Sequence, residues 1–329
     1  MICSSQAATA APSDTARGAS LDVAALRVAL IGYGEVGAIF GAALIGAGVS
    51  AVRAFDVLIA DPSWTAKAAA RAARDVVLAT SAADAIAGAD LVICAVTAAE
   101  TKRAAEAIAR ACRRDAFVLD VNSASPQTKT ACAEIMARVG AHYVEAAVMS
   151  SVPPFGIRVP MLLGGPHARA VHPLLARLGF EASVGSERYG VVSAIKLCRS
   201  VVVKGMEALA IESLLAARRY GVECEVLASL AETFPGLEWE RQATWFWRRV
   251  MQHGRRRAEE MHEAAVTIAD AGFTPRMATA TADVQSWIAA LRSQGVFATA
   301  GADPAWRELA DSIPRSGDDD AADRAQPPE

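Results

Sequence analysis

The sequence lacks the residue clusters that mark disulfide frameworks and metal sites. Its six cysteines include no C-x-x-C pair, and its five histidines form neither an H-x-H nor an H-x-x-x-H cluster. Several cysteines lie inside apolar runs, where cysteine acts as a small hydrophobic residue. We therefore expect no metal site and a reducing, cytoplasmic compartment.

The chain also has little net charge and no uninterrupted apolar run. A formal net charge of -3 provides no overall field that would attract nucleic acid or anionic lipid. The stretch 40–55 is apolar, but glycines and Arg53 interrupt it, which favours helix, turn and strand over a membrane span. Residues 1–20 lack the basic and apolar regions of a signal peptide. We expect neither a nucleic-acid nor a membrane partner.

What the chain does have is material for a substantial core. Of its 329 residues, 53% are hydrophobic and 21% are charged, and the length predicts one large or two moderate domains. From Leu26 to Val184, strand and helix patterns alternate, which predicts an α/β fold with a doubly wound, mostly parallel sheet. After Tyr189 no strand pattern follows, so we expect a second, all-α domain.

A glycine-rich turn is the strongest motif. The apolar run 28–31 precedes Gly32, Gly34 and Gly37 at the G-x-G-x-x-G spacing, and a small-residue helix is expected over 38–46. The first glycine permits the tight turn, the second lets a diphosphate approach the backbone, and the third lets helix and strand pack closely. Free N–H groups at the helix start then bind the phosphates. This context predicts a Rossmann domain.

The choice of dinucleotide depends on an acid at the end of the next predicted strand. Asp56 lies roughly 20 residues beyond the glycines, where a carboxylate binds the adenosine ribose hydroxyls. A 2′-phosphate would face this charge, and neither Val57 nor Leu58 supplies a compensating arginine. The pattern favours NAD, with NADP as the weaker alternative. We expect these cofactor-binding residues: Gly32, Tyr33, Gly34, Glu35, Val36, Gly37, Asp56, Val96 and Thr97.

A lysine inside an apolar helix is the best candidate for proton transfer. Lys196 lies within the apolar run 191–203, where a charged amine is costly unless it is paired or neutral. Burial lowers the pKa of a lysine toward the range that suits general acid and base catalysis. Ser200 lies one turn further on the same face and could bind the substrate. The alternative is a lysine whose ammonium group simply reaches the surface.

The helical domain contains further polar and aromatic residues that could have a structural or a functional role. Lys204 and Glu207 are spaced for an ion pair on a helix surface. The aromatic run 245–247 could cover an aromatic substrate or fill a helix or dimer interface. Four residues are spaced to share one helix face: His253, Arg256, Arg257 and Glu260. Arg257 could bind a substrate carboxylate there; the alternative is an exposed face with an Arg256–Glu260 pair.

Four places between Leu26 and Ala310 resemble the β-hydroxyacid dehydrogenase family, which includes the 3-hydroxyisobutyrate and 6-phosphogluconate dehydrogenases. The first is the glycine turn with its following acid. The second, 120–126, reads D-V-N-S-A-S-P and is similar to the family's D-x-S-T-x-S-P. The third, 145–152, lies at the place of A-P-V-S-G-G and reads E-A-A-V-M-S-S-V. The fourth, 190–200, matches G-x-x-x-x-x-K-x-x-x-N up to its last position.

This resemblance implies roles for individual residues. Lys196 matches the catalytic acid/base, and Ser123 matches the serine that binds substrate near the nicotinamide. A loop that holds the substrate carboxylate through its serine and backbone N–H groups is matched by Ser150, Ser151 and Val152. Among the chain's departures from the family, Ser151-Val152 replace two glycines and Ser200 replaces an asparagine. These departures concern the substrate more than the reaction.

Two further stretches resemble one branch of the family. They are K-L-C-R-S-x-x-x-K-G-x-E-A-L over 196–209 and R-R-A-E-E-M over 256–261. This branch lies near phenylserine dehydrogenase and carries a C-terminal helical domain once catalogued without a function. The likeness implies a β-hydroxy carboxylic or β-hydroxy amino acid as the substrate.

The domain borders follow from the changes in pattern. We expect a disordered arm over 1–24, an NAD-binding domain over 25–187, a helical substrate and dimerisation domain over 188–313, and an acidic disordered tail over 314–329. The helix expected over 190–220 is apolar on several sides, as in helices buried between layers or subunits. It therefore predicts a homodimer formed through the helical domain.

The combined hypothesis is an NAD-dependent dehydrogenase of small β-hydroxy acids. Lys196 would exchange the hydroxyl proton while hydride moves to or from the nicotinamide. Two alternatives remain open. One is a cofactor-binding scaffold without catalysis, against which the retained lysine argues. The other is an imine reductase, which shares this architecture, although Lys196 and the Ser123 segment favour an alcohol.

Overall fold

The computed structural model describes residues 21–71, 73 and 75–314, which divide into two compact units between Cys198 and Arg199. Helix α9, Val191–Tyr220, runs across this division. Most of the predicted arm and nearly all of the predicted tail lie outside the described residues. Leu21 and Val23, which fall within the predicted arm, pack against buried residues of the first unit, and Val23–Ala25 form a 3-10 turn, η1.

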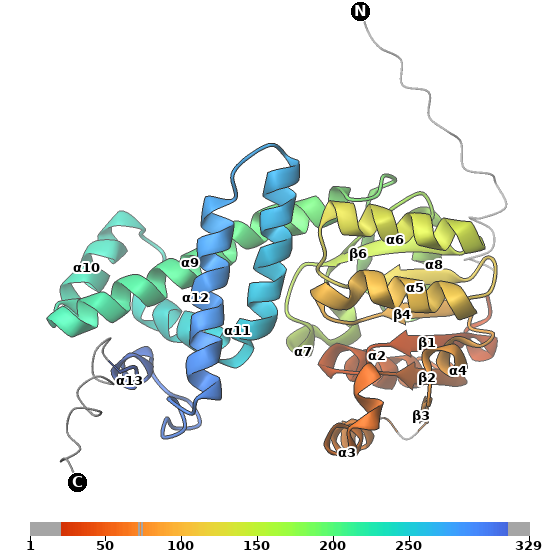
Figure 1. Ribbon diagram of the computed structural model, residues 1–329, viewed down its shortest axis with the longest axis horizontal. Helices are drawn as coiled ribbons and strands as arrows, with labels where there is room; N and C mark the ends of the chain where they lie inside the picture. The colour runs from red at the N-terminus through yellow and green to blue at the C-terminus, as the bar shows by residue number, and fades with distance from the viewer. Residues whose placement is uncertain (1–20, 72, 74, 315–329) are drawn as a thin grey trace, which may run out of the picture. The chain divides into compact units, whose positions relative to one another are not determined.

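The first unit is built on one sheet of eight strands in the order β3-β2-β1-β4-β5-β6-β7-β8 (Figure 1). The strands are β1 Arg27–Ile31, β2 Ala51–Phe55, β3 Val76–Leu78, β4 Leu91–Cys94, β5 Phe117–Asp120, β6 His142–Val148, β7 Met161–Gly164 and β8 Ala182–Ser186. All neighbouring strands are parallel except β6 and β7. The predicted doubly wound, mostly parallel sheet is confirmed.

The connection between β6 and β7, residues 149–160, carries no full helix. A parallel crossover usually packs a full helix across one face of the sheet. Here the connection holds only two short helical turns, α7 Val152–Phe155 and the 3-10 turn η4 Gly156–Arg158. The chain therefore turns back and runs antiparallel to β6.

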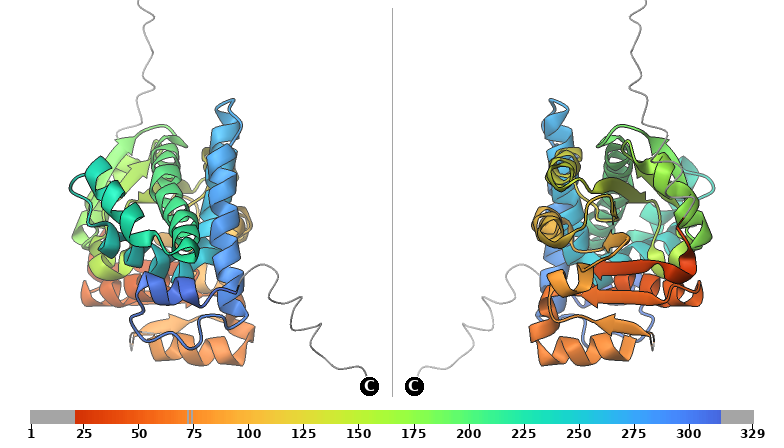
Figure 2. Two further views of the ribbon diagram at one scale, coloured as in Figure 1. Left: turned by 90° about the vertical axis from the view of Figure 1, so that its left-hand side faces the viewer. Right: turned by 90° about the vertical axis from the view of Figure 1, so that its right-hand side faces the viewer.

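Helices cover both faces of the sheet. One face carries α4 Ala82–Ile86, α5 Thr101–Ala111 and α6 Pro126–Val139, and Figure 2 shows α5 and α6 end-on and side by side. The other face carries α2 Glu35–Gly46 and α8 Ala168–Arg177. The sequence pattern does not predict α3 Pro62–Arg71 or the short α7.

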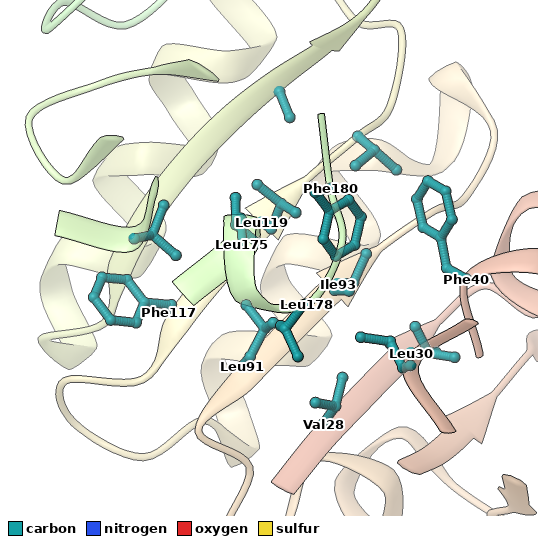
Figure 3. Packing of buried hydrophobic residues seen from close by; sticks show 14 of the residues in the cluster. Val28, Leu30, Phe40, Leu91, Ile93, Phe117, Leu119, Leu175, Leu178 and Phe180 are labelled. Atoms are coloured by element: carbon teal, nitrogen blue, oxygen red, sulfur yellow. The ribbon is translucent and has the colours of Figure 1, made fainter. Parts of the chain in front are cut away.

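The side chains of the strands alternate between two cores, as a sheet buried on both sides requires. Ala29 and Ile31 of β1 point toward α4, α5 and α6, whereas Val28 and Leu30 point toward α2 and α8. Figure 3 shows the second of these cores, where Phe40 and Phe180 meet edge-on with ring centroids 5.3 Å apart.

The second unit consists of the remainder of α9 with α10 Glu223–Thr233, α11 Trp239–Asp270, α12 Arg276–Ser293 and α13 Trp306–Asp311, and its described residues form no strand. Helices α11 and α12 run side by side in opposite directions (Figure 1). Phe246 and Trp247 are buried here, with Trp247 in the unit's core, whereas Trp245 is half exposed and stacks with Arg249. Packing between helices therefore accounts for the two buried rings.

Buried ion pairs link α9 to α11. The predicted Lys204–Glu207 surface pair is wrong: Lys204 Nζ lies 2.8 Å from Glu260, and Glu207 pairs with Arg257. The predicted Arg256–Glu260 pair is present at 3.0 Å. Spacing along one helix shows only which residues can meet, and the packing of a second helix supplied other partners.

The first turn of α9 is held by a buried carboxylate from β6. Glu145 accepts hydrogen bonds from the Gly190 N–H at 2.7 Å and from the Ser193 hydroxyl at 2.6 Å. Gly190 has φ +83°, and a Cβ there would lie 2.9 Å from Pro126 Cβ. A carboxylate at a helix start also offsets the positive end of the helix dipole. Glu145 thereby holds the first turn of α9 next to β6.

We expect Glu145→Ala to lower the free energy of unfolding of the first unit by about 2–4 kcal/mol, because a buried N–H and hydroxyl lose their acceptor. Glu145→Gln should cost less, since its amide can accept from Gly190 and pair with Ser193. Urea denaturation followed by circular dichroism gives the comparison. Equal losses for the two variants would contradict this role.

The same variants test a pH dependence. Burial raises the pKa of Glu145 above its ordinary value of 4.5. Folding therefore favours the protonated form of Glu145. Its contribution to the free energy of unfolding is fully present below pH 4.5 and is lost as the pH rises through the raised pKa of the folded state. In Glu145→Gln this part of the stability profile should disappear.

Candidate active site

The candidate site lies where the parallel strands of the first unit end. Their carboxyl ends open at one edge of the sheet, which is where ligands bind in doubly wound folds. Most of the residues predicted for the site lie in the segments that follow these ends: 32–37 after β1, Asp56 after β2, 96–97 after β4, Ser123 after β5, and 150–152 after β6. The topology thus brings together segments that are far apart in the sequence.

The three motif glycines meet different spatial demands. Gly32 has φ +92°, and a Cβ on it would lie 2.4 Å from the Ala95 carbonyl oxygen. A Cβ on Gly37 would lie 2.3 Å from the Gly32 oxygen. A Cβ on Gly34 meets nothing within 4 Å, and Gly34 directly precedes the 12-residue helix α2. Two glycines are therefore required by packing, and the third leaves open space at a helix start, which fits a diphosphate.

The other residues of the turn differ in what they expose. The Tyr33 ring is buried in the core, so only its backbone can face a cofactor. Glu35 is the exposed first residue of α2, and Val36 packs partly against the core. After β4, Val96 lies close to Gly32, whereas Thr97 is exposed and precedes the short turn Ala98–Glu100.

Asp56 ties the end of β2 to the glycine turn. Its carboxylate accepts the Tyr33 N–H at 2.8 Å and the Leu58 N–H at 3.0 Å, the latter as the cap of the 3-10 turn η2, Val57–Ala60. The side chain is half-buried. The carboxylate is oriented by backbone groups before any ligand binds.

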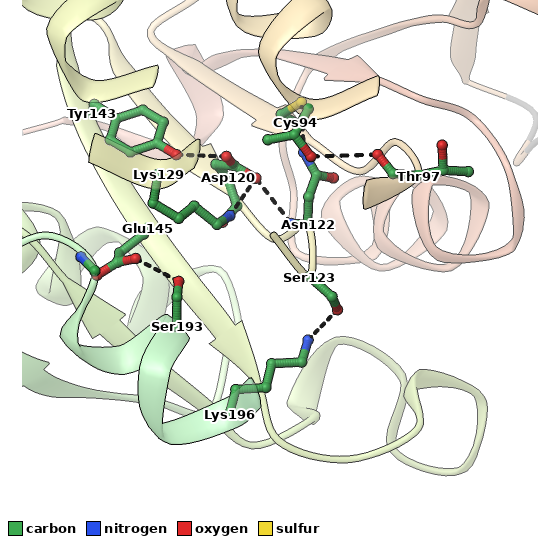
Figure 4. A network of polar contacts seen from close by, with 12 residues as sticks. Cys94, Thr97, Asp120, Asn122, Ser123, Lys129, Tyr143, Glu145, Ser193 and Lys196 are labelled. Atoms are coloured by element: carbon green, nitrogen blue, oxygen red, sulfur yellow. Dashed lines mark hydrogen bonds and ion pairs between the residues drawn. The ribbon is translucent and has the colours of Figure 1, made fainter. Parts of the chain in front are cut away.

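The buried carboxylate of Asp120 organises the loop after β5 (Figure 4). Asp120 accepts hydrogen bonds from the Tyr143 hydroxyl at 2.6 Å and the Asn122 N–H at 2.9 Å, and its ion pair with Lys129 Nζ spans 2.9 Å. Burial raises the pKa of Tyr143, and the Asp120 charge adds to this, so the phenol stays a donor. The network holds the backbone next to Ser123.

The sequence motifs do not point to Lys129 or Glu145, although both support the site. Lys129 carried a usable signal, because it shares the spacing of one helix face with Cys132, Ala133 and Met136, which are buried. A lysine on such a face needs a buried partner. Nothing in the sequence identifies that partner as Asp120, or the partner of Glu145 as the start of α9.

Lys196 and Ser123, which are 73 residues apart, meet in the structure. The distance between Lys196 Nζ and Ser123 Oγ is 2.6 Å (Figure 4). Lys196 is partly buried and lies in the second turn of α9, just beyond the residues bound by Glu145. A loop anchored by Asp120 and a helix anchored by Glu145 therefore present an amine and a hydroxyl to each other.

For the remaining predicted substrate-binding residues, the structure gives their exposure and position in the fold. Ser150 is exposed, Ser151 precedes α7, and Val152 has its side chain in the core, so only its backbone can face a ligand. Ser200 lies one turn beyond Lys196 on α9. Arg257 is buried and paired with Glu207 inside the second unit, and we leave it out of the proposed site.

Within the part of the chain that the structure describes, no three His, Cys, Asp or Glu residues are grouped to hold a metal ion. None of the helices in that part has the length and apolar character needed to cross a membrane. The five described cysteines are unpaired.

Two family models match the sequence. Residues 27–179 match the NAD binding domain of 6-phosphogluconate dehydrogenase. Residues 217–288 match a domain of unknown function, DUF1932. No curated protein matches the chain.

Solved structures of the same fold cover nearly the whole chain. A conserved hypothetical protein from Sinorhizobium meliloti 1021 is 35% identical, with 90% of this chain and 99% of that chain covered and a TM-score of 0.67. The conserved protein MTH1747, described as structurally similar to 3-hydroxyacid dehydrogenases, is 31% identical, with 82% and 99% covered and a TM-score of 0.61. The 3-hydroxyisobutyrate dehydrogenase of Mycobacterium tuberculosis, solved with L-serine, shares the fold at 20% identity, with 88% and 100% covered and a TM-score of 0.66.

The family matches cover part of the candidate site. The NAD-binding match spans the glycine turn, Asp56 and Ser123, and the two relatives above 30% identity cover both units. The DUF1932 match, 217–288, lies within the helical domain expected over 188–313. A place near phenylserine dehydrogenase stays a prediction. The chain belongs to the β-hydroxyacid dehydrogenase family.

Proposed function

We propose that this NAD(P)-dependent oxidoreductase uses NAD to interconvert a small β-hydroxy carboxylic or β-hydroxy amino acid and its carbonyl form, with Lys196 as general acid and base. The observation that carries the proposal is the 2.6 Å contact between Lys196 Nζ and Ser123 Oγ. An alcohol that reacts at this point needs a group to exchange its proton and a group to bind its oxygen, and the contact supplies both.

The chain's own residues account for the proton and the position of the substrate. When bound, the nicotinamide would supply the acceptance and donation of hydride. Neutral Lys196 would take the hydroxyl proton in oxidation, and protonated Lys196 would return it in reduction. Ser123 would hold the reacting oxygen beside the amine. Ser150, Ser151 and the Val152 backbone would bind the carboxylate, and Ser200 would add a hydroxyl.

Anchoring of both partners supports this assignment. Catalytic groups act best when their supporting contacts hold them near the productive geometry. Ser123 follows a loop bound by Asp120, and Lys196 follows helix turns bound by Glu145. Neither partner depends on a long flexible loop.

NAD is proposed as the preferred cofactor because of Asp56. Its oriented, half-buried carboxylate lies beside the glycine turn, where the adenosine ribose would bind. A 2′-phosphate there would be repelled, and the next residues, Val57 and Leu58, are apolar.

A homodimer through the helical domain is also proposed. Val202, Met206 and Leu209 lie at i, i+4 and i+7 on α9 and are 64%, 36% and 57% exposed. An exposed apolar stripe of this kind usually marks a protein interface. A second copy of the chain is the partner that would be present wherever the protein is made.

We expect Lys196→Ala to lower kcat on a true substrate by about 10²–10⁴-fold, because it removes the general acid/base. Lys196→Arg should be similarly impaired, since arginine keeps the charge but does not release its proton. NADH absorbance with a panel of 3-hydroxy acids and 3-hydroxy amino acids provides the measurement. The exposed Lys102, changed to alanine, is the matched control.

Other outcomes of this assay distinguish the alternatives. Near wild-type turnover by Lys196→Ala would show that the lysine is not the acid/base. Activity on cyclic imines but on no hydroxy acid would identify an imine reductase. Tight NAD binding without turnover of any substrate would favour the scaffold.

The wild-type protein should bind NAD more tightly than NADP. Asp56→Asn keeps the shape of the side chain and an acceptor for Leu58 but removes the charge, so the NADP/NAD affinity ratio should rise about tenfold. Isothermal titration with both cofactors measures this ratio. The exposed Asp75, changed to asparagine, should leave it unchanged. If the two variants had the same NADP/NAD affinity ratio, Asp56 would not be the source of the NAD preference.

Light scattering should give twice the mass of one chain. Leu209→Glu places a charge within the apolar stripe and should shift the protein toward monomers. Val77→Glu is the matched control, because Val77 is 51% exposed on β3 of the first unit. A wild-type mass near that of one chain would refute the dimer.

A further inference from the structure

The order of the strand ends gives a direction to the proposed cofactor. Asp56 follows β2, the glycine turn follows β1, Cys94 ends β4, and Asn122 comes shortly after β5, and these strands are neighbours in this order. Dinucleotides bind along such an edge with the diphosphate at the glycine turn. With the adenosine at Asp56, the nicotinamide end therefore points toward the segment that contains Asn122 and Ser123.

Asn122 is unusual among the polar residues of this segment. Its side chain is buried, at 4% exposure, yet its Oδ1 atom has no hydrogen-bond partner in the described part of the chain. Buried polar atoms are almost always paired, because leaving one unpaired destabilises the fold. The residue therefore carries an acceptor that the folded chain does not use.

The rest of Asn122 is held in place. Its backbone N–H donates to Asp120 at 2.9 Å, and its Nδ2 lies 3.3 Å from Cys94 Sγ. Burial raises the pKa of Cys94 to about 12, so the sulfur is a neutral thiol and a weak acceptor. One end of the amide is thus oriented by the end of β4 (Figure 4), and the carbonyl oxygen has no donor among the described residues.

We propose that the Asn122 carbonyl accepts a hydrogen bond from the carboxamide NH₂ of the nicotinamide ring. This inference rests on the proposed function. The carboxamide is the only donor group on the reacting ring itself, and the next residue, Ser123, contacts Lys196. A hydrogen bond from the carboxamide to Asn122 fixes how the ring is turned with respect to that contact. Asn122 is then a cofactor-binding residue that selects the nicotinamide end.

Titration calorimetry with two nucleotides tests the inference without any substrate. NAD and ADP-ribose share the adenosine and diphosphate, but only NAD has the ring. Asn122→Leu, which keeps the branched shape and removes the acceptor, should weaken NAD binding about 3- to 10-fold and leave ADP-ribose binding within about twofold. Asn122→Ser provides the same comparison with a smaller side chain if the leucine variant does not fold.

An analogue completes the cycle. 3-Acetylpyridine adenine dinucleotide carries a methyl group in place of the carboxamide NH₂. The wild-type protein should bind it more weakly than NAD, and Asn122→Leu should bind the two with equal affinity.

The outcomes distinguish this inference from the proposed function on which it rests. Wild-type protein that binds neither nucleotide would overturn both. Wild-type binding with no change in the variant, or an equal loss for NAD and ADP-ribose, would overturn the role of Asn122 alone. An equal loss would assign Asn122 to the fold instead of to the ring.

Discussion

Two buried carboxylates on neighbouring strands are the constraint on which the candidate site depends. Asp120 and Glu145 are register partners across β5 and β6, and both are almost fully buried. Each reaches beyond its strand to a different segment: Asp120 binds the loop before Ser123, and Glu145 binds the start of α9. The contact between Ser123 and Lys196 therefore has its geometry set by one pair of adjacent positions in the sheet.

Two like charges at adjacent buried positions are costly unless other groups compensate them. Lys129 supplies the compensation, through an ion pair with Asp120 and an attraction that acts on Glu145 as well. The remaining acceptor capacity is taken by Tyr143, Asn122, Gly190 and Ser193. Such a network contributes more to the position of the site than to net stability, because well-packed apolar residues would fill the same volume at lower cost.

The helical unit uses buried charge in a different way. Glu207 and Lys204 of α9 pair with Arg257 and Glu260 of α11, so the two long helices are held in register by ion pairs as well as by apolar packing. These ion pairs account for the charged residues on the facing sides of α9 and α11, so no ligand is needed to explain them. The exposed apolar stripe lies on another side of α9, whose buried side carries these charged residues together with apolar core residues such as Ile211 and Leu214.

The sequence by itself determined the fold class, the glycine turn and the family, because each depends on local patterns: the period of the apolar residues, the spacing of three glycines, and short motifs. It also singled out Lys196, since a lysine in an apolar run is visible without coordinates. Only the tertiary structure decided the partners. That Asp120 meets Lys129, that Glu145 caps α9, that Arg257 faces Glu207 and that Lys196 reaches Ser123 depend on contacts between residues distant in the chain. The spacing of side chains along one helix or strand does not predict those contacts, because they form only when the strands and helices pack together.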